Sequence, residues 1–480
     1  MLELYPEQKY ACVLEGSSSP SPLSRYSFFC TDPFLVFHSK RARSFAGPPD
    51  AIEPLEGDPL ANLAALLQKY RPSTTSWVPG LPPFLGGAVG YLGYELLYLI
   101  ETIPDLGVDD LALPDAYFIF CDTVIATDHL AQKSWIIANG FADSLAEATA
   151  SATRRLAEAR ERMSGLGARP PAHVSRDDLR TRGRALMKER PRLGLEHLTT
   201  AGIRPVMTKD AYLDVVCRAK EHILAGDIFE VCTAQRFDTE VASSGMDLYR
   251  ALRAINEAPF ASYLRFPEAE VLSSSPERFL RLDRDRWAET RPIKGTRPRG
   301  ETREKDEAML RDLVSSEKDN AENIIIVDLA RNDLGRVCEF GTVRVPELRI
   351  AETYPFAHQL VSTVRGRLRS ELGMIDLLRA TFPGGSMTGA PKVEAMKVID
   401  RLEPVKRGIF AGSIGYFDFE GSFDLNIVIR TLIKKGDLLS FHVGGALVMD
   451  SVPEDEYQET LDKAHALVLA IELTKQGLSR

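Results

Sequence analysis

The sequence predicts an α/β protein built as two lobes or one elaborate sandwich, and three observations lead to this prediction. The chain has 480 residues. Single hydrophobic cores usually stop growing at about 250–300 residues, so a more complex core is expected. Short runs of β-branched and aromatic residues alternate with turn signals in the first part of the chain. Further along, similar runs alternate with helix-like segments.

The first segment, residues 1–140, has the composition of a β-sheet. "PLSRYSFFCTDPFLVFH" (22–38) and "DAYFIFCDTVIATD" (115–128) carry β-branched and aromatic residues at a density typical of strands. "PPFLGGAVGYLGYE" (82–95) repeats glycine, which predicts close packing of neighbouring backbones in a sheet.

Residues 141–206 are predicted to be a helix followed by a linker. "ADSLAEATASATRRLAEARERM" (142–163) is rich in Ala, Glu, Arg and Leu, which favours a helix. From Ser164 to about Arg204 the chain is polar and interrupted by proline, so we expect a linker or exposed excursion there.

From residue 207 to about 470, helices alternate with strands. "TKDAYLDVVCRAKEHILAGD" predicts a capped amphipathic helix with Thr208 as its N-cap and Gly226 as its stop. Strands such as "ASYLRF", "EVLSSS" and "GTVRVPELRI" are interspersed with helices such as 303–331 and 374–380.

The composition argues against several classes of protein. The chain has 59 Lys and Arg against 68 Asp and Glu, a net charge of −9, with no long basic run, which disfavours nucleic acid as the main partner. Its six cysteines lack C-x-x-C spacing, which disfavours a zinc site or a disulfide framework. No apolar run approaches the ~18–20 residues of a membrane span. The N-terminus also lacks the pattern of a signal peptide. We therefore expect a cytoplasmic protein.

Two helix-like segments each carry a pair of carboxylates three residues apart, and so on one helix face. Asp319 and Glu322 form the first pair, and Glu456 and Glu459 form the second. Each pair taken alone is typical of a solvated helix face. If the two helices meet, the four side chains supply the oxygen-rich site that Mg²⁺ prefers.

Three further positions have both a functional and a plain structural interpretation. Arg430 stands in the apolar run "NIVIRTL", where it needs a carboxylate partner, either the protein's own or a ligand's. His358 is a catalyst or a buried core histidine. Lys294, in "RPIKGTRPRG", precedes a glycine from which a tight turn can present its amine as a nucleophile; otherwise it is one more cation in a basic loop.

The stretch "ATFPGGSMTGAPKVEAM" (380–396) is predicted to be a loop that leads into a helix near Ala390 or Pro391. Amides of such a loop can hold an anion at the helix N-terminus. The alternative is a tight strand-to-helix turn with no ligand.

Together these motifs resemble the chorismate-utilising enzymes. "SPERF", "PIKGTRPRG", "AENIIIVDLARNDLGR", "HQLVSTV", "FPGGSMTGAPK", "GSIGY", "IRTL" and "EYQETLDK" stand in the order and spacing of that family, within residues 207–470. Residues 1–140 resemble it more weakly. The resemblance implies an α+β fold like that of anthranilate synthase component I. This is a two-sheet, mainly antiparallel sandwich with helices outside, which residues 1–140 complete around a chorismate-binding catalytic domain.

Within this family, the residues resemble component I of aminodeoxychorismate synthase most closely, with component I of anthranilate synthase as the alternative. Lys294 distinguishes the two, because anthranilate synthases have alanine there ("PIAGT"). The resemblance implies that Lys294 attacks C2 of chorismate as the 4-hydroxyl leaves, and that ammonia then adds at C4 and expels the lysine. We expect Arg291 and Arg297, together with Mg²⁺ and partial burial, to lower the pKa of Lys294.

The resemblance also implies roles for the acidic residues. Glu322 and Glu459 match ligands of a magnesium ion, with Asp319 and Glu456 as nearby or water-mediated carboxylates. Glu277, in "SPERF", matches the general acid that protonates the departing hydroxyl.

A further set of residues is implied to bind chorismate. Two of them match groups that bind its enolpyruvyl carboxylate, three match groups that hold its ring carboxylate, and two lie beside the ring or in the neighbouring loop. In that order they are Arg430 and Tyr416, Lys463 with the Gly444–Gly445 backbone, and His358 with Thr296.

Glu230, in "IFEVCTAQRF", stands where isochorismate and salicylate synthases carry a lysine that activates water, so a water-adding reaction is disfavoured. Ammonia-using members usually have glutamine there, so Glu230 either changes how ammonia is handled or pairs with a cation. None of the six cysteines stands in a glutaminase-type G-x-C-x-G elbow. We therefore expect ammonia from a separate glutamine amidotransferase subunit or from solution.

"LEGSSS" followed by "SRYSF" resembles an element that lines a tryptophan pocket in anthranilate synthases, although Gly16 replaces a larger side chain. A similar pocket in this chain is one expectation. A plain strand–turn–strand is the other.

Overall fold

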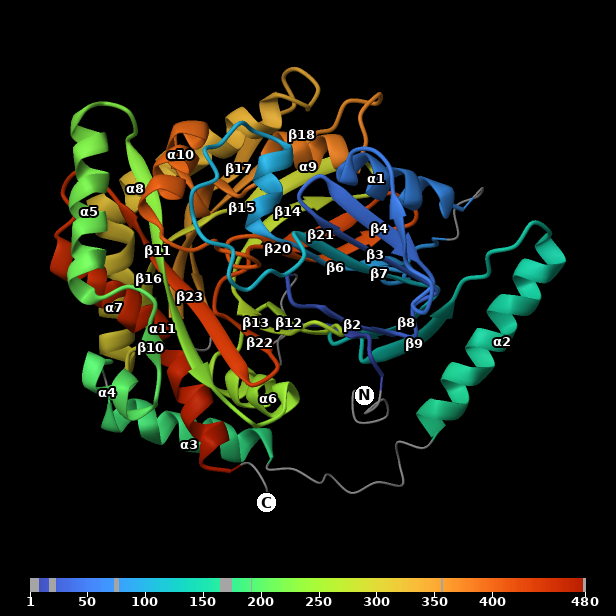
Figure 1. Ribbon diagram of the computed structural model, residues 1–480, viewed down its shortest axis with the longest axis horizontal. Helices are drawn as coiled ribbons and strands as arrows, with labels where there is room; N and C mark the ends of the chain where they lie inside the picture. The colour runs from blue at the N-terminus through green and yellow to red at the C-terminus, as the bar shows by residue number, and fades with distance from the viewer. Residues whose placement is uncertain are drawn as a thin grey trace.

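Two large β-sheets pack face to face in the computed structural model, and the helices lie mostly on their outer sides (Figure 1). All pairings between the named strands of more than two residues are antiparallel. The fold class predicted from the sequence is therefore confirmed. The structure describes residues 8–16, 23–72, 77–164, 175–190, 192–354 and 357–477.

The first sheet has 11 strands. In spatial order they are β10 (Arg204–Pro205), β11 (Glu230–Glu240), β23 (Leu438–Leu447), β22 (Thr431–Lys435), β13 (Glu270–Ser275), β12 (Phe260–Arg265), β1 (Ala11–Glu15), β2 (Tyr26–Thr31), β8 (Thr123–Asp128) and β9 (Lys133–Ala138), with β19 (Gly389–Ala390) paired to β11.

The second sheet has 12 strands. In spatial order they are β16 (Ile293–Pro298), β18 (Ala357–Arg367), β15 (Trp287–Arg291), β14 (Arg278–Leu282), β21 (Phe423–Asn426), β20 (Ser413–Asp418), β6 (Gly87–Leu92), β7 (Ala116–Cys121), β3 (Leu35–Lys40), β4 (Arg43–Gly47) and β5 (Glu53–Leu55), with β17 (Arg344–Thr353) paired to β18.

Strands from residues 1–140 lie in both sheets. In the first sheet β1 pairs with β12 and β2, and in the second sheet β6 pairs with β20 and β7. The glycines of β6 permit this close packing: a Cβ on Gly90 would lie 1.8 Å from the carbonyl oxygen of Tyr117, and one on Gly87 would lie 2.0 Å from that of Phe417. The N-terminal segment is thus an integral part of the sandwich.

The helices complete the fold. They are α1 (Pro59–Lys69), α2 (Leu145–Ser164), α3 (Arg176–Glu189), α4 (Leu195–Thr200), α5 (Lys209–Leu224), α6 (Gly245–Ile255), α7 (Arg303–Ser315), α8 (Glu317–Gly335), α9 (Met374–Thr381), α10 (Lys392–Leu402) and α11 (Pro453–Lys475). Figure 1 shows α2 at the periphery, where it packs on β9 and β8. In the part of the chain that the structure describes, no helix has the length and apolarity needed to cross a membrane.

Local signals explain several helix boundaries. Thr208 caps α5 by accepting a hydrogen bond from the Ala211 amide at 3.2 Å, and Gly226 follows with a φ of +80°, as predicted. The predicted helix 303–331 is instead two helices, because the Ser316 side chain accepts from the Asp319 amide and starts a new helix there.

The prediction of a linker from Ser164 to about Arg204 was wrong in part. This stretch contains α3 and α4, and α3 begins where the Ser175 hydroxyl accepts a hydrogen bond from the Asp178 amide. Arg180 of α3 forms an ion pair with Glu257 at 2.5 Å, so tertiary contacts support a helix whose composition is mostly polar.

Six elements converge at one end of the sandwich. Helix α8 packs on β16 and β18, α11 packs on β23, and β23 pairs with β11 along ten residues. The predicted carboxylates lie on α8 and α11, and Lys294 lies on β16. The fold thereby brings together residues that are far apart in the sequence.

Candidate active site

Lys294 lies at a bulge in β16. The pairing register with β18 shifts between Ile293 and Thr296, and Gly295 has a φ of +87°. A Cβ on Gly295 would lie 2.9 Å from Cγ of Asp319, so both the backbone conformation and the space require glycine. The Lys294 side chain is buried, with 8% exposed. The glycine after Lys294 therefore forms a bulge within a strand, and not the tight turn that the sequence predicts.

The amine of Lys294 is held by two carboxylates. Its Nζ donates a hydrogen bond to Oε1 of Glu230 at 2.5 Å, and Oε2 of Glu322 lies 3.9 Å away. Glu230 is itself 1% exposed and its other oxygen, Oε2, has no hydrogen-bond partner among the described residues. Of the two interpretations of Glu230, the structure supports pairing with a cation.

The prediction that the pKa of Lys294 is lowered was wrong. Burial disfavours the charged form of Lys294, but the negative charges of Glu230 and Glu322 outweigh burial and hold its pKa above the ordinary value. The two flanking arginines do not oppose this effect, because each is neutralised by acidic partners of its own. Those partners are Glu347 and Glu352 for Arg291, and Asp312 and Asp319 for Arg297.

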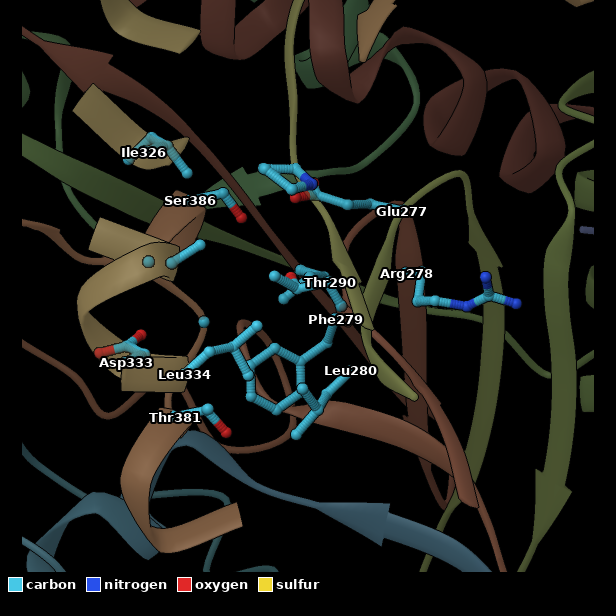
Figure 2. Close-up of a pocket in the computed structure, with 15 residues that line it drawn as sticks. Glu277, Arg278, Phe279, Leu280, Thr290, Ile326, Asp333, Leu334, Thr381 and Ser386 are labelled. Atoms are coloured by element: carbon cyan, nitrogen blue, oxygen red, sulfur yellow. The ribbon is translucent and has the colours of Figure 1, made fainter. Parts of the chain in front are cut away.

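Glu277 is a buried carboxyl group between β13 and β14. Burial raises its pKa to about 7, while a hydrogen bond with the Ser386 side chain, the charge of Lys294 and the backbone amide of Ile293 oppose the shift. A carboxyl group with this pKa is partly protonated near neutral pH and can donate a proton. Figure 2 shows Glu277 and Ser386 on the same side of a cavity.

One glutamate from each predicted carboxylate pair, Glu322 and Glu456, approaches the same lysine. Nζ of Lys318 lies 3.9 Å from Oε1 of Glu322 on α8 and 3.6 Å from Oε1 of Glu456 on α11. The Glu459 carboxylate is near enough to raise the pKa of Lys318 as well. Gly445 of β23 faces the same group: a Cβ there would lie 3.2 Å from Oε2 of Glu456.

This group of carboxylates has the chemistry of a cation site. Burial raises the pKa of Glu322 to about 7, the charge of Lys294 opposes the shift, and Glu230 adds to it. The Oε2 atom of Glu456 is buried and has no hydrogen-bond partner among the described residues. Carboxylate oxygens such as those of Glu322, Glu456 and Glu459 are the ligands that a hard cation such as Mg²⁺ prefers.

The predicted metal set is nevertheless not assembled as a whole. Asp319 is held by Arg297, whose Nη2 lies 2.9 Å from Oδ2, and Glu459 is held by Lys463 at 2.6 Å. Over the ranges that the structure describes, no three acidic, histidine or cysteine side chains stand close enough together to bind a metal ion as they are.

Arg430 lies in the short link before β22 rather than inside a strand, with a φ of +54°. Its Nη1 donates to the carbonyl oxygen of Lys463 at 2.6 Å, and burial lowers its pKa to about 10 although Glu459 opposes this. Among the described residues it forms no ion pair within 4.0 Å, so the predicted alternative of an internal salt bridge was wrong. Its guanidinium remains available for a ligand's carboxylate.

Lys463 and the Gly444–Gly445 backbone are brought together as predicted. Nζ of Lys463 donates to the carbonyl oxygen of Gly444 at 2.8 Å. The same amine forms the ion pair with Glu459, so it links the predicted ring-carboxylate group to the carboxylate cluster.

Tyr416 is not placed with Arg430. Its ring packs 4.5 Å from that of Phe84 and 5.6 Å from that of Phe28, centroid to centroid, between the two sheets. The sequence pattern could not separate a substrate-binding tyrosine from a core tyrosine in the strand "GSIGYF", because both interpretations predict an aromatic residue facing inward.

His358 and Thr296 also differ from expectation. His358 is buried, and both ring nitrogens have partners: Nδ1 lies 2.8 Å from Oγ1 of Thr353 and Nε2 lies 3.0 Å from Oδ1 of Asp306. This supports the interpretation of a satisfied core histidine. Thr296 lies on β16 with its residue exposed.

Sequence reasoning missed Lys318 and Ser386. Lys318 stands four residues before Glu322, a spacing that predicts an ion pair on one helix face and that was a usable signal. Ser386 follows two glycines in the loop before α10, and nothing in its local sequence points to Glu277.

The predicted tryptophan pocket falls partly on residues 17–22, outside the described residues. Of its described part, Gly16 has no room for a side chain, because a Cβ would lie 2.2 Å from the carbonyl oxygen of Ser24. Glu15 is held by Arg253 and by the Tyr249 hydroxyl at 2.9 Å.

Comparisons with known proteins identify the class to which this fold and site belong. A family model described as chorismate binding enzyme matches residues 19–469. The chain is 37% identical to anthranilate synthase component 1 of Acetivibrio thermocellus over 474 residues, 98% of this chain and 92% of that protein. The chain therefore belongs to the chorismate-binding enzyme family, and specifically to its anthranilate synthase and aminodeoxychorismate synthase type.

A second relative and a solved structure agree with this assignment. The chain is 43% identical to the aminodeoxychorismate synthase of Streptomyces pristinaespiralis over 403 residues, 83% of this chain and 52% of that protein, so it spans about half of that relative. The crystal structure of anthranilate synthase component I from Streptococcus pneumoniae superposes with a TM-score of 0.77 at 29% identity, covering 94% of this chain and 93% of that one.

Proposed function

We propose that this chain is component I of an aminodeoxychorismate synthase. It would transfer an amino group from ammonia to chorismate and form 4-amino-4-deoxychorismate, the precursor of 4-aminobenzoate and folate. The observation that carries this proposal is the buried amine of Lys294, held at 2.5 Å by Glu230, at a position where anthranilate synthases of the family have alanine.

The two carboxylates of chorismate have cationic partners in the site. Arg430 offers a partly buried guanidinium without a carboxylate partner among the described residues, which suits the enolpyruvyl carboxylate. Lys463 and the backbone at Gly444 suit the ring carboxylate. When bound, Mg²⁺ would be held by Glu322, Glu456 and Glu459, and would neutralise negative charge at the ring carboxylate.

The reaction then requires a nucleophile and an acid. Glu230 lies where it can take a proton from the Lys294 ammonium, and the free amine forms a bond to C2 of chorismate. The C4–O bond breaks as the double bond shifts, and Glu277 protonates the departing hydroxyl to give water. Ammonia adds at C4, the C2–N bond breaks, and the lysine amine is regenerated.

The ammonia is proposed to come from a glutamine amidotransferase subunit. The sequence has six cysteines and none in a G-x-C-x-G elbow, so a glutamine-hydrolysing site of that type has no candidate nucleophile in this chain. With ammonium salts at alkaline pH, the isolated chain should work without the partner.

The second candidate is anthranilate synthase component I, which forms anthranilate and pyruvate from the same substrates. The relative that is 37% identical over 98% of this chain favours it. Lys294 disfavours it, since its amine occupies the face of C2 to which ammonia must add in that reaction.

Chromatography of the products from chorismate, Mg²⁺ and an ammonium salt tests the proposal. We expect 4-amino-4-deoxychorismate and no pyruvate. Formation of anthranilate with an equal amount of pyruvate would assign the chain to the second candidate.

A further inference from the structure

A small cavity lies against Glu277 (Figure 2). Residues of β14, β15, α8 and the loop before α10 line it. Its walls are mainly apolar, with Phe279, Ile326, Ala330 and Leu334 among them. Figure 2 shows Glu277 and Ser386 on one side of this space and Asp333 and Thr381 on the other.

The cavity is bounded by tightly packed and ion-paired groups. Nζ of Lys392 lies 2.5 Å from Oδ2 of Asp333 and donates to the carbonyl oxygen of Thr381 at 2.7 Å, which ties together α8, α9 and α10. A Cβ on Gly384 would lie 2.5 Å from Cδ1 of Ile427, and one on Gly385 would lie 2.7 Å from Cδ2 of Leu329. A side chain at either glycine would therefore displace a neighbouring apolar side chain.

The chemistry proposed above requires an exchange of two small molecules at C4, and the present inference rests on that proposed function. The C4–O bond breaks and the proton of Glu277 leaves with the hydroxyl as water. The nitrogen of ammonia then forms a bond to C4, the Lys294 nitrogen takes back its electron pair from C2, and one proton of the new ammonium group returns to Glu277. Water leaves, ammonia enters, and Glu277 ends in its starting state.

We propose that this cavity is the site from which ammonia reaches C4. Glu277 lines the cavity and is also the residue that exchanges a proton with both molecules. Lys294, which attacks C2, does not line it, and neither do Arg430 and Lys463, which are proposed to hold the carboxylates of chorismate. An apolar wall admits neutral ammonia and water but disfavours ammonium and larger ions, because an unpaired charge is costly to bury.

The test fills the cavity from α8. Ala330→Leu adds side-chain volume inside the cavity. Asn332→Leu is the control, because it also introduces a leucine on α8 but at an exposed position. We expect Ala330→Leu to raise the KM for ammonium salts by about tenfold, with the KM for chorismate unchanged. We expect the Lys294 adduct, formed with Mg²⁺ and chorismate in the absence of ammonia, to appear at the wild-type rate by intact-protein mass spectrometry. Asn332→Leu should leave all three quantities unchanged.

Other outcomes would overturn the inference. One is an unchanged KM for ammonium in Ala330→Leu. The other is an equal rise in the KM for ammonium and for chorismate, in a variant whose melting temperature equals that of the wild type. If Ala330→Leu does not fold, Ala330→Val makes a smaller change and should give a smaller rise in the same quantity. The product of the wild-type enzyme separates the two proposals: anthranilate and pyruvate would refute the proposed function, whereas 4-amino-4-deoxychorismate with an unchanged ammonium KM would refute only the role of the cavity.

Discussion

At the scale of single residues, the pair of Lys294 and Glu230 controls when the amine is free. Both side chains are buried and 2.5 Å apart, so the lysine is stabilised in its charged form until its proton is removed. A nucleophilic amine must be neutral to react. The rate of adduct formation should therefore rise with pH until Glu277, whose pKa is about 7, loses the proton that the departing hydroxyl requires.

Glu230→Gln tests this control. The amide oxygen can still accept the hydrogen bond, but one of the two negative charges that raise the pKa of Lys294 is lost. The pKa of the lysine should fall, and the pH at which adduct formation is half-maximal should move to lower values. The measurement is the rate of adduct formation by mass spectrometry across the pH range. Glu240→Gln, at the exposed end of the same strand, is the matched control. An unchanged midpoint would contradict the prediction.

Glu277 has a cost for stability that Glu277→Gln should reveal. Its folded pKa of about 7 lies above the unfolded value, so the stability it contributes is present at low pH and is lost as the pH rises toward 7. Removing the ionisable group should be nearly neutral at pH 5 and should stabilise by about 3 kcal/mol at pH 8. The variant should also fail to form the adduct. Denaturant unfolding at pH 5 and pH 8 measures the difference in stability between the variant and the wild type. An equal difference at both pH values would show that the buried charge of Glu277 does not cause it.

The local sequence could indicate some of these residues but not others. Lys294 was recognisable because a glycine bulge and a basic loop are both local features. The charged environment of Lys294 could not be recognised from the sequence. Glu230 and Glu322 are 64 and 28 residues away along the chain and approach Lys294 only in the folded structure. The sequence neighbours Arg291 and Arg297 turned out to be irrelevant to its pKa, since each has acidic partners.

At the scale of elements, the junction of α8 and α11 forms the carboxylate site. Each helix supplies two acidic residues with a spacing of three, and Lys318 lies between Glu322 and Glu456. The spacing was readable from the sequence. The meeting of the helices was not, because it depends on α8 packing on β16 and α11 packing on β23.

Magnesium should stabilise this junction. We expect MgCl₂ to raise the melting temperature of the wild-type protein, because the ion replaces a lysine between buried carboxylates. Glu322→Gln and Glu459→Gln should each abolish the rise and most of the turnover while keeping the fold. Glu454→Gln, in the exposed first turn of α11, serves as the control. A full magnesium response in both site variants, or full activity in EDTA, would contradict the assignment.

The excursion of residues 141–206 shows how tertiary contacts override local signals. Its first helix was predicted from composition within a few residues of the observed Leu145–Ser164. The helices α3 and α4 were missed because their polar composition resembles a linker, and contacts such as Arg190 with Glu472 on α11, at 2.7 Å, hold them in place.

At the scale of the whole molecule, the N-terminal segment cannot be separated from the catalytic part. Strand β1 lies between β12 and β2, and β6 lies between β20 and β7. Without residues 1–140, the first sheet would lose the four strands beyond β12 and the second would lose the five strands beyond β20, so β12 and β20 would become unpaired edges.

A truncation should show this dependence. Residues 207–480 expressed alone are expected to lack a cooperative thermal transition and to aggregate, because β12 and β20 would each have an open hydrogen-bonding edge. Co-expression with residues 1–206 should restore a soluble complex. The measurements are size-exclusion chromatography and circular dichroism of both preparations. A monomeric fragment that melts cooperatively would refute the prediction.

The short pairing of β19 with β11 has a consequence for how the site works as a unit. Glu230 is paired with Ala390, only four residues after the serine that holds Glu277. Backbone pairing thus connects the loop whose Ser386 binds Glu277 to the strand that carries Glu230. A shift in this pairing would move both Glu230 and Glu277. Bond formation at C2 and bond cleavage at C4 would then be impaired together.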